Sequence, residues 1–145
     1  MKTIVLPVDF SDTTAHLIEA TVQFAKEVDA KICLIHITPT NSGFVVGDTG
    51  FQYFPEIEQT EIKRELSELN DLENLIKKQN IECEHLLKQG IASELILDYA
   101  KDKNADYIVM GSHGRSGIYD VFIGSLTKEI TRTSPIPVLI IPCHQ

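Results

Sequence analysis

A segment near the C-terminus, residues 110–129 (MGSHGRSGIYDVFIGSLTKE), combines spaced glycines with hydroxyl side chains. It follows the spacing G-x2-G-x9-G-[ST], carried by Gly111, Gly114, Gly124 and Ser125. Glycines let backbone N–H groups approach an anion because no Cβ stands in the way. A helix beginning at Ser125 adds free N–H donors and partial positive charge, and the hydroxyls of Ser125 and Thr127 can donate as well. The segment therefore predicts a phosphate-binding loop.

Each of these glycines taken alone is more typical of a tight turn after a strand than of a phosphate site. The complete spacing favours the phosphate-binding interpretation, and Arg115 and Lys128 are the nearest cations. The segment is not a Walker A loop, because no Gly-Lys-Ser/Thr occurs in it. It is also not G-x-G-x-x-G, so a dinucleotide site is not indicated.

Asp9 is the second candidate for ligand contact, because it directly follows the first apolar run of the chain. A carboxylate at the end of a first strand can accept both hydroxyls of a ribose. The competing interpretation is an aspartate that caps a helix or closes a turn. Ser11 and Asp12 are already available as helix caps, which favours the ribose interpretation.

The histidines and cysteines carry little sign of a metal site. His113 lies within the glycine segment, where it can contact a phosphate or be a loop residue without a role, and catalysis by it is not expected. Cys33 and His36 are three apart in a predicted strand, so they point to opposite faces and cannot share an ion. No other Cys/His cluster has the spacing of metal ligands.

Two kinds of segment alternate along the chain and must position these residues. Apolar runs predict strands at 3–8, 31–38, 81–88, 106–110 and 136–141. Helical spacing of apolar residues predicts helices over 15–25, 56–80, 92–102 and 125–133. The alternation predicts one domain over residues 1–145: an α/β, Rossmann-like, open twisted parallel sheet of five strands with helices on both faces. Ligands of such sheets bind at the carboxyl ends of strands, which are followed here by residues 7–11 and 111–119.

Three further segments give structural expectations. The helix over 56–80 carries an apolar stripe that should pack on the sheet: Ile62, Leu66, Leu69, Leu72 and Ile76. Residues 41–55 (NSGFVVGDTGFQYFP) form an irregular stretch with exposed aromatics, which favours a mobile surface loop over an adenine clamp or a partner contact. The last strand is bounded by prolines, which is typical of a sheet edge.

Composition excludes several classes of protein. The 145 residues include 13 Lys plus Arg and 21 Asp plus Glu, a net charge of -8, so binding to a nucleic-acid backbone is not expected. No apolar run is long enough to span a membrane, and the N-terminus does not have the pattern of a signal peptide. Three widely spaced cysteines indicate reduced thiols in a cytoplasmic protein.

The sequence resembles the universal stress protein family over nearly its whole length. The resemblance is carried by residues 4–11 (IVLPVDFS), 34–37 (LIHI), 105–114 (ADYIVMGSHG) and 137–141 (PVLII), in order and with the right spacing. It implies the adenine nucleotide alpha hydrolase-like fold. Members of the family that bind ATP carry G-x2-G-x9-G-[ST], which is complete here.

The resemblance also implies a set of site residues. The phosphates would be held by Gly111, Gly114, Gly124, Ser125, Leu126 and Thr127. Asp9, with Pro7 and Val8, would meet the ribose and adenosine side. Ile37 would line the adenine pocket, and Met110 and His113 would flank the site. The resemblance further implies Mg²⁺ or Mn²⁺ on the phosphates and a homodimer paired through the last strand.

Three functions remain open from the sequence. The first is a stress-response or signalling protein that binds ATP as a ligand and has a protein partner not identified by the sequence. The second is a weak ATPase or an enzyme that phosphorylates itself, for which Ser112, Ser116, Ser125 and Thr127 supply nearby hydroxyls. The third is a dimeric interaction module with a vestigial nucleotide site. No general base is evident beside the glycine segment and no P-loop lysine is present, so the first is favoured.

Overall fold

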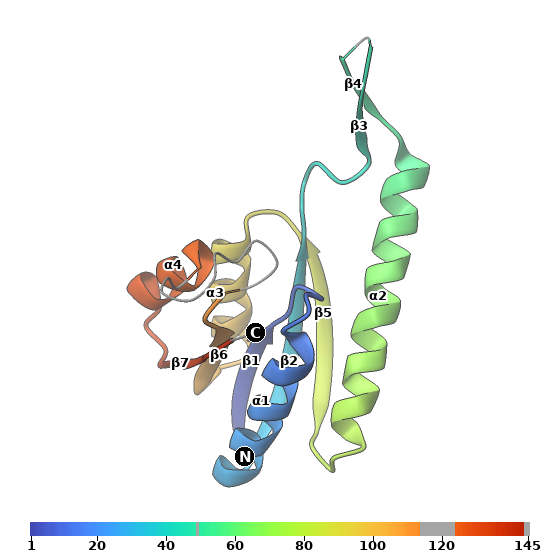
Figure 1. Cartoon of the computed structure of the whole chain (residues 1–145). Coiled ribbons are helices and arrows are strands. Elements are labelled where there is room, and N and C mark those ends of the chain that lie inside the picture. The colour runs from blue at the N-terminus through green and yellow to red at the C-terminus, as the bar shows by residue number, and fades with distance from the viewer. Residues whose placement is uncertain (49, 114–123, 144–145) are drawn as a thin grey trace.

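The computed structural model describes residues 1–48, 50–113 and 124–143, and its main sheet is parallel throughout (Figure 1). The order across this sheet is β5-β2-β1-β6-β7. Its strands are β1 (Lys2–Pro7), β2 (Ala30–Thr38), β5 (Cys83–Gln89), β6 (Tyr107–Gly111) and β7 (Val138–Ile141). The expected five-stranded parallel sheet is confirmed. Chain order reverses between β1 and β6, which is where ligands of open α/β sheets bind.

Helices cover both faces of the sheet, as the alternating sequence predicts (Figure 1). They are α1 (Thr14–Val28), α2 (Pro55–Lys77), α3 (Ala92–Asp102) and α4 (Ser125–Thr133). α1 and α2 pack on the face that presents Ile4, Leu6 and Leu34, whereas α3 and α4 pack on the face that presents Val5 and Ile35. The two cores are separate because neighbouring residues of a strand point to opposite faces.

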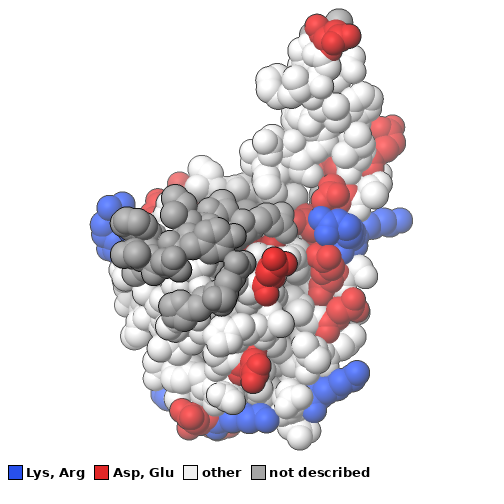
Figure 2. Space-filling model, viewed as in Figure 1, with Lys and Arg blue, Asp and Glu red and all other residues white. Residues whose placement is uncertain are grey.

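Residues 41–55 are not irregular, in contrast to the expectation from the sequence. They contain an antiparallel hairpin of β3 (Phe44–Gly47) and β4 (Gly50–Tyr53). The hairpin projects beyond the main sheet beside the start of α2 (Figure 1), and every residue described in its strands is exposed. The face of the hairpin seen in Figure 2 shows no charged side chains except acidic ones at the tip. The alternation of buried and exposed residues that usually reveals a strand is therefore missing here.

One member of the apolar stripe predicted for α2 does not pack on the sheet. Leu66 is 40% exposed, while Leu69 and Ile76 are fully buried. The place expected for Leu66 is taken by Glu65, which is only 5% exposed. A carboxyl group buried to this degree requires polar partners, and they are described with the site below.

No helix in the described ranges is both long and apolar enough to cross a membrane. The expectation for the last strand is confirmed, because β7 lies at one edge of the sheet, next to β6.

Candidate functional site

A cavity of about 240 Å³ opens at the carboxyl ends of β1, β2 and β6, where the strand order reverses. Residues predicted as site residues from widely separated segments line it together: Pro7, Val8, Asp9, Ile37, Met110, Gly111, His113, Gly124, Ser125, Leu126 and Thr127. Gly114 was also predicted, and it lies outside the described residues, as do Arg115 and Ser116. The parallel sheet brings the loop after β1 and the start of α4 to one place.

The loop after β1 holds Asp9 in a tight turn. The backbone N–H of Ser11 donates to Oδ1 of Asp9 at 3.0 Å, so this carboxylate has the turn role that the sequence left as an alternative. Asp9 also lines the cavity, so the turn does not remove it from the site. Neither Ser11 nor Asp12 caps α1, in contrast to the expectation: the N-cap residue is Thr13, and it makes no side-chain capping bond.

The start of α4 faces the cavity with backbone donors. Its N-cap residue Gly124 makes no side-chain capping bond, and Ser125, Leu126 and Thr127 follow as its first turn. The first N–H groups of a helix have no partner within that helix, and groups of this kind can bind an anion. The N–H of Gly124 itself donates to the carbonyl oxygen of Ser112 at 2.7 Å, which fixes the helix start against the end of β6.

Thr127 has a different role from the one expected. Its hydroxyl donates to the carbonyl oxygen of Gly111 at 2.8 Å, and the side chain is buried. The hydroxyl proton is therefore used within the protein rather than offered to a ligand. Thr127 still contributes a backbone N–H in the first turn of α4, which is the donor that an anion in the cavity would meet.

The two motif glycines among the described residues, Gly111 and Gly124, differ in what a Cβ would meet. A Cβ on Gly111 would come within 2.9 Å of Sγ of Cys143, so a side chain there would require that neighbour to shift. A Cβ on Gly124 would meet only ordinary contacts, at 3.5 Å from Cα of His113. Gly124 has a φ of −59°, which any residue adopts. Among the residues that the structure describes, neither a contact nor the backbone conformation requires glycine at 124.

His113 lies beside the start of α4. Its Nδ1 is 3.3 Å from Oγ of Ser112, and that oxygen accepts the N–H of Cys143 at 2.9 Å. The hydroxyl of Ser112 can therefore donate to Nδ1 of His113. Nε2 is then the other polar atom of the His113 ring.

Much of the remaining wall of the cavity is apolar. Ile37 and Met110 come from strand ends, as expected, and Ala92 and Ile96 of α3 were not predicted. A planar, largely apolar group fits between such side chains. The cavity thus combines an apolar side, a carboxylate and a helix N-terminus.

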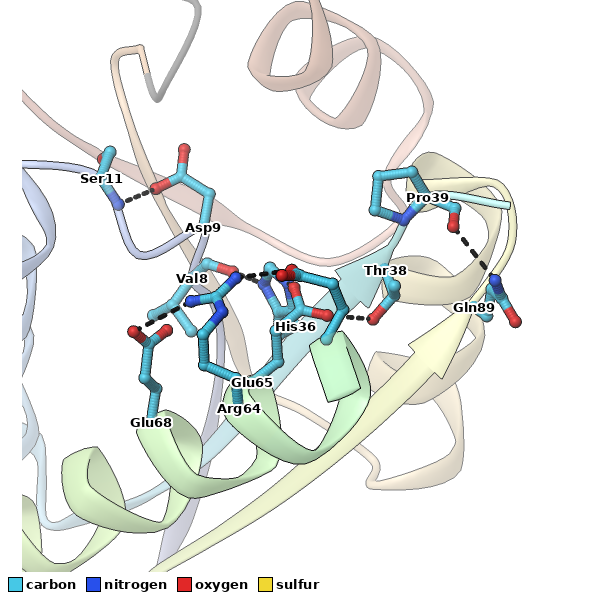
Figure 3. A network of polar contacts seen from close by, with 11 residues as sticks. Val8, Asp9, Ser11, His36, Thr38, Pro39, Arg64, Glu65, Glu68 and Gln89 are labelled. Carbon is cyan, nitrogen blue, oxygen red and sulfur yellow. Dashed lines mark hydrogen bonds and ion pairs between the residues drawn. The ribbon is translucent and has the colours of Figure 1, made fainter. Parts of the chain in front are cut away.

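A buried polar network supports the loop that carries Asp9 (Figure 3). Nδ1 of His36 lies 2.7 Å from the carbonyl oxygen of Val8, and Nε2 of the same ring is hydrogen-bonded to Oε2 of Glu65. The other carboxylate oxygen of Glu65 accepts the hydroxyl of Thr38 at 2.9 Å. His36 and Glu65 are each 5% exposed, so α2 contributes a polar residue to the region beneath the cavity.

Sequence reasoning missed several lining residues: Thr13, Leu17, Ile35, His36, Ala92 and Ile96. Ile35 and His36 directly precede Ile37 near the end of β2, so strand position was a usable signal for them. Glu65 was missed as a neighbour of the site. It falls three residues after Ile62 and four before Leu69, at helical spacing with the stripe, and a carboxylate in such a stripe indicates a buried partner.

No group of three or more His, Cys, Asp or Glu side chains within the ranges described above is arranged to hold a metal ion. Cys33 and His36 lie on opposite faces of β2, as expected. Burial raises the pKa of the Cys33 thiol to about 11 and that of Cys83 to about 12. These two thiols are therefore poor nucleophiles and poor metal ligands near neutral pH.

Comparison with known proteins gives a consistent result. The model of the universal stress protein family matches residues 1–142. Universal stress protein YxiE of Bacillus subtilis is 32% identical over 139 residues, which cover 92% of this chain and 94% of YxiE. The solved structure of universal stress protein UspA from Lactobacillus plantarum has a TM-score of 0.79 at 21% identity and covers 97% of each chain.

A second solved structure is that of the universal stress protein from Archaeoglobus fulgidus in complex with dAMP. It has a TM-score of 0.67 at 21% identity and covers 97% of this chain and 98% of its own. At these identities the two structures establish a common fold. The family match over residues 1–142 and the 32% identity to YxiE show that the chain belongs to the universal stress protein family.

Proposed function

We propose that this protein binds an adenine nucleotide, ATP in the first instance, in the cavity between β1 and β6, and that the bound nucleotide serves stress-response signalling. The observation that carries the proposal is the convergence of three features in one cavity: Asp9 at the end of β1, an apolar wall, and the start of α4. Each feature suits a different part of a nucleotide.

The three features divide the nucleotide between them. The adenine ring would lie against Ile37 and Met110, where apolar side chains exclude water. The ribose hydroxyls would donate to the carboxylate of Asp9. The phosphates would accept the backbone N–H groups of the first turn of α4, whose partial positive charge favours an anion.

Two further observations support an adenine nucleotide. The spacing G-x2-G-x9-G-[ST] is complete in the sequence, and no contact with a described residue requires glycine at 124. The Archaeoglobus fulgidus relative, which has the same fold, is described in complex with dAMP.

The nucleotide would act as a bound ligand rather than as the substrate of a fast reaction. The glycine segment contains no P-loop lysine, and catalysis of phosphoryl transfer depends on such charge-stabilising groups. A ligand of this kind acts by favouring the conformation that binds it best. Mg²⁺ or Mn²⁺ would be held by the phosphates, whose charge it offsets.

The test is titration of nucleotide-free protein with ATP and Mg²⁺ by calorimetry, for the unaltered protein and for G124V. Valine at 124 would add bulk to the lining of the cavity where the phosphates are proposed to lie, so the affinity should fall at least about tenfold. G47V is the matched control, because Gly47 lies on the exposed hairpin and a Cβ there meets nothing closer than 3.9 Å. Equal affinity in G124V and G47V would show that the start of α4 does not hold the phosphates.

A homodimer through β7 forms part of the same proposal. β7 is an edge strand, and an edge presents unpaired N–H and C=O groups that a second chain can pair. Light scattering after size exclusion should give twice the chain mass of 16.2 kDa. A mass equal to one chain would exclude this pairing.

A further inference from the structure

Glu65 lies on α2, yet its carboxylate is part of the support of the loop that carries Asp9 (Figure 3). We propose that Glu65 and His36 are positioning residues that fix this loop in the shape that binds nucleotide. The effect of the two residues on the shape of the loop is argued from geometry alone. The effect on nucleotide binding rests on the proposed function.

The hydrogen-bond pattern fixes the orientation and the proton count of the pair. The carbonyl oxygen of Val8 can only accept, so Nδ1 of His36 must carry a proton and donate it. Nε2 of His36 and Oε2 of Glu65 then share a single proton, whichever of the two atoms holds it. Since Oε1 accepts the hydroxyl of Thr38, both carboxylate oxygens have partners in the protein.

The loop itself needs such support. Phe10 has a φ of +59°, and the left-handed region is unfavourable for a bulky side chain. The ring of Phe10 lies 4.4 Å from the ring of His36, centroid to centroid. His36 therefore holds the loop at two points: its Nδ1–H binds the carbonyl of Val8, and its ring contacts Phe10. Asp9 lies between these two residues.

Packing alone does not explain why His36 and Glu65 are buried together. Burying two ionisable groups costs free energy that hydrophobic residues of similar volume would not cost. The neighbouring stripe residues Leu69 and Ile76 show that this face of α2 otherwise packs with apolar side chains. The polar pair is found where the face of α2 meets the loop of the cavity, which ties its presence to that loop.

The experiment compares four substitutions at three buried residues of α2 and β2: Glu65, Leu69 and Thr38. E65L removes the partner of His36 and keeps the volume. E65Q can accept from Thr38 and donate to Nε2 of a neutral His36, so it preserves the geometry without the shared proton. L69A is the matched control, because it creates a cavity on the same face of α2 one turn further on. T38V, a milder change, loosens one side of Glu65 and serves if E65L does not fold.

The first readout is hydrogen exchange of the amides of Val8 and Ser11 in protein without nucleotide. Both amides have acceptors, the carbonyl of Ile35 and Oδ1 of Asp9, so their protection reports loop order. We expect these amides to exchange at least about tenfold faster in E65L than in L69A, with E65Q within about threefold of the unaltered protein. T38V should fall between E65Q and E65L.

The second readout is the affinity for ATP with Mg²⁺, which should fall at least about tenfold in E65L and recover in E65Q. Equal loop exchange in E65L and L69A would overturn the positioning role, whatever ATP does. Faster loop exchange with unchanged ATP affinity would overturn its consequence for binding. If the loop loosens as expected while the unaltered protein binds no nucleotide, the proposed function fails and the support of the loop by Glu65 stands.

Discussion

The hydroxyl of Thr127 donates to the carbonyl oxygen of Gly111 at 2.8 Å, which ties the first turn of α4 to the last residue of β6. These two residues are 16 apart in sequence and lie near opposite ends of the segment 110–129. The bond therefore fixes where the N–H groups of α4 lie relative to the end of the sheet. Any anion held by that helix start depends on this relationship.

Replacing Thr127 by valine should weaken both folding and nucleotide binding. The change keeps the shape and removes the donor, which should lower the free energy of unfolding by about 1 kcal/mol. ATP affinity should fall severalfold because the start of α4 is no longer fixed. Denaturant unfolding and calorimetry measure the two effects. T127S keeps the hydroxyl, so binding by T127S that is as weak as binding by T127V would argue against the role of this bond.

Asp9 has a turn role and a proposed ribose role, and two substitutions separate them. D9N keeps Oδ1 as an acceptor for the N–H of Ser11, so the turn should persist. Its amide cannot accept from two ribose hydroxyls, so ATP affinity should still fall about tenfold. D9A loses both and should bind more weakly than D9N. If D9N binds ATP like the unaltered protein, Asp9 is a turn residue and does not hold the ribose.

The hairpin of β3 and β4 should contribute little to the stability of the sheet. Val46 is 69% and Phe51 75% exposed, and the two are paired across the hairpin. V46T and F51S should each change the free energy of unfolding by less than about 0.5 kcal/mol, as exposed sites do. L69A on α2 should cost about 2–5 kcal/mol by comparison. A large loss in F51S would mean that the hairpin packs against another part of the molecule or a second copy.

Two of the thiols should resist alkylation in the folded protein. Burial raises the pKa of Cys33 from 9.0 to about 11 and that of Cys83 to about 12, so their thiolate fraction grows only as the pH approaches these values. At pH 8 the thiolate fraction of Cys33 is about a hundredfold lower than that of an unperturbed thiol. Iodoacetamide followed by peptide mapping should label both residues far more slowly in native than in denatured protein. Rapid native labelling of Cys33 at pH 8 would contradict its burial.

Much of this arrangement follows from the sequence because it depends on chain order. Strands that alternate with helices form a parallel sheet, so Asp9 after the first strand and Gly111 at the end of β6 must lie at the same edge. Nothing about side-chain packing is needed to bring these two residues together. The same rule brings Ile37, near the end of β2, to the cavity.

What the sequence did not predict depends on contacts between distant residues. Glu65 meets a histidine 29 residues earlier, and helical periodicity of α2 cannot show which strand residue faces it. The sequence did not predict the hairpin of β3 and β4, because Phe44 and Tyr53 pair outside the core, where no alternation of buried and exposed residues marks a strand. The sequence predicted that the hydroxyl of Thr127 would face a ligand. Its bond to Gly111 could not be predicted, because that bond depends on how α4 packs against β6.

The most direct measurement is to denature protein purified from cells and identify the small molecules that it releases by chromatography and mass spectrometry. The account predicts a stoichiometric amount of adenine nucleotide, or, if the site is emptied during purification, saturable binding of ATP with Mg²⁺ on titration. Absence of nucleotide together with absence of binding would contradict it. The cavity between β1 and β6 would then be a structural feature of an interaction module, and the glycine segment a turn.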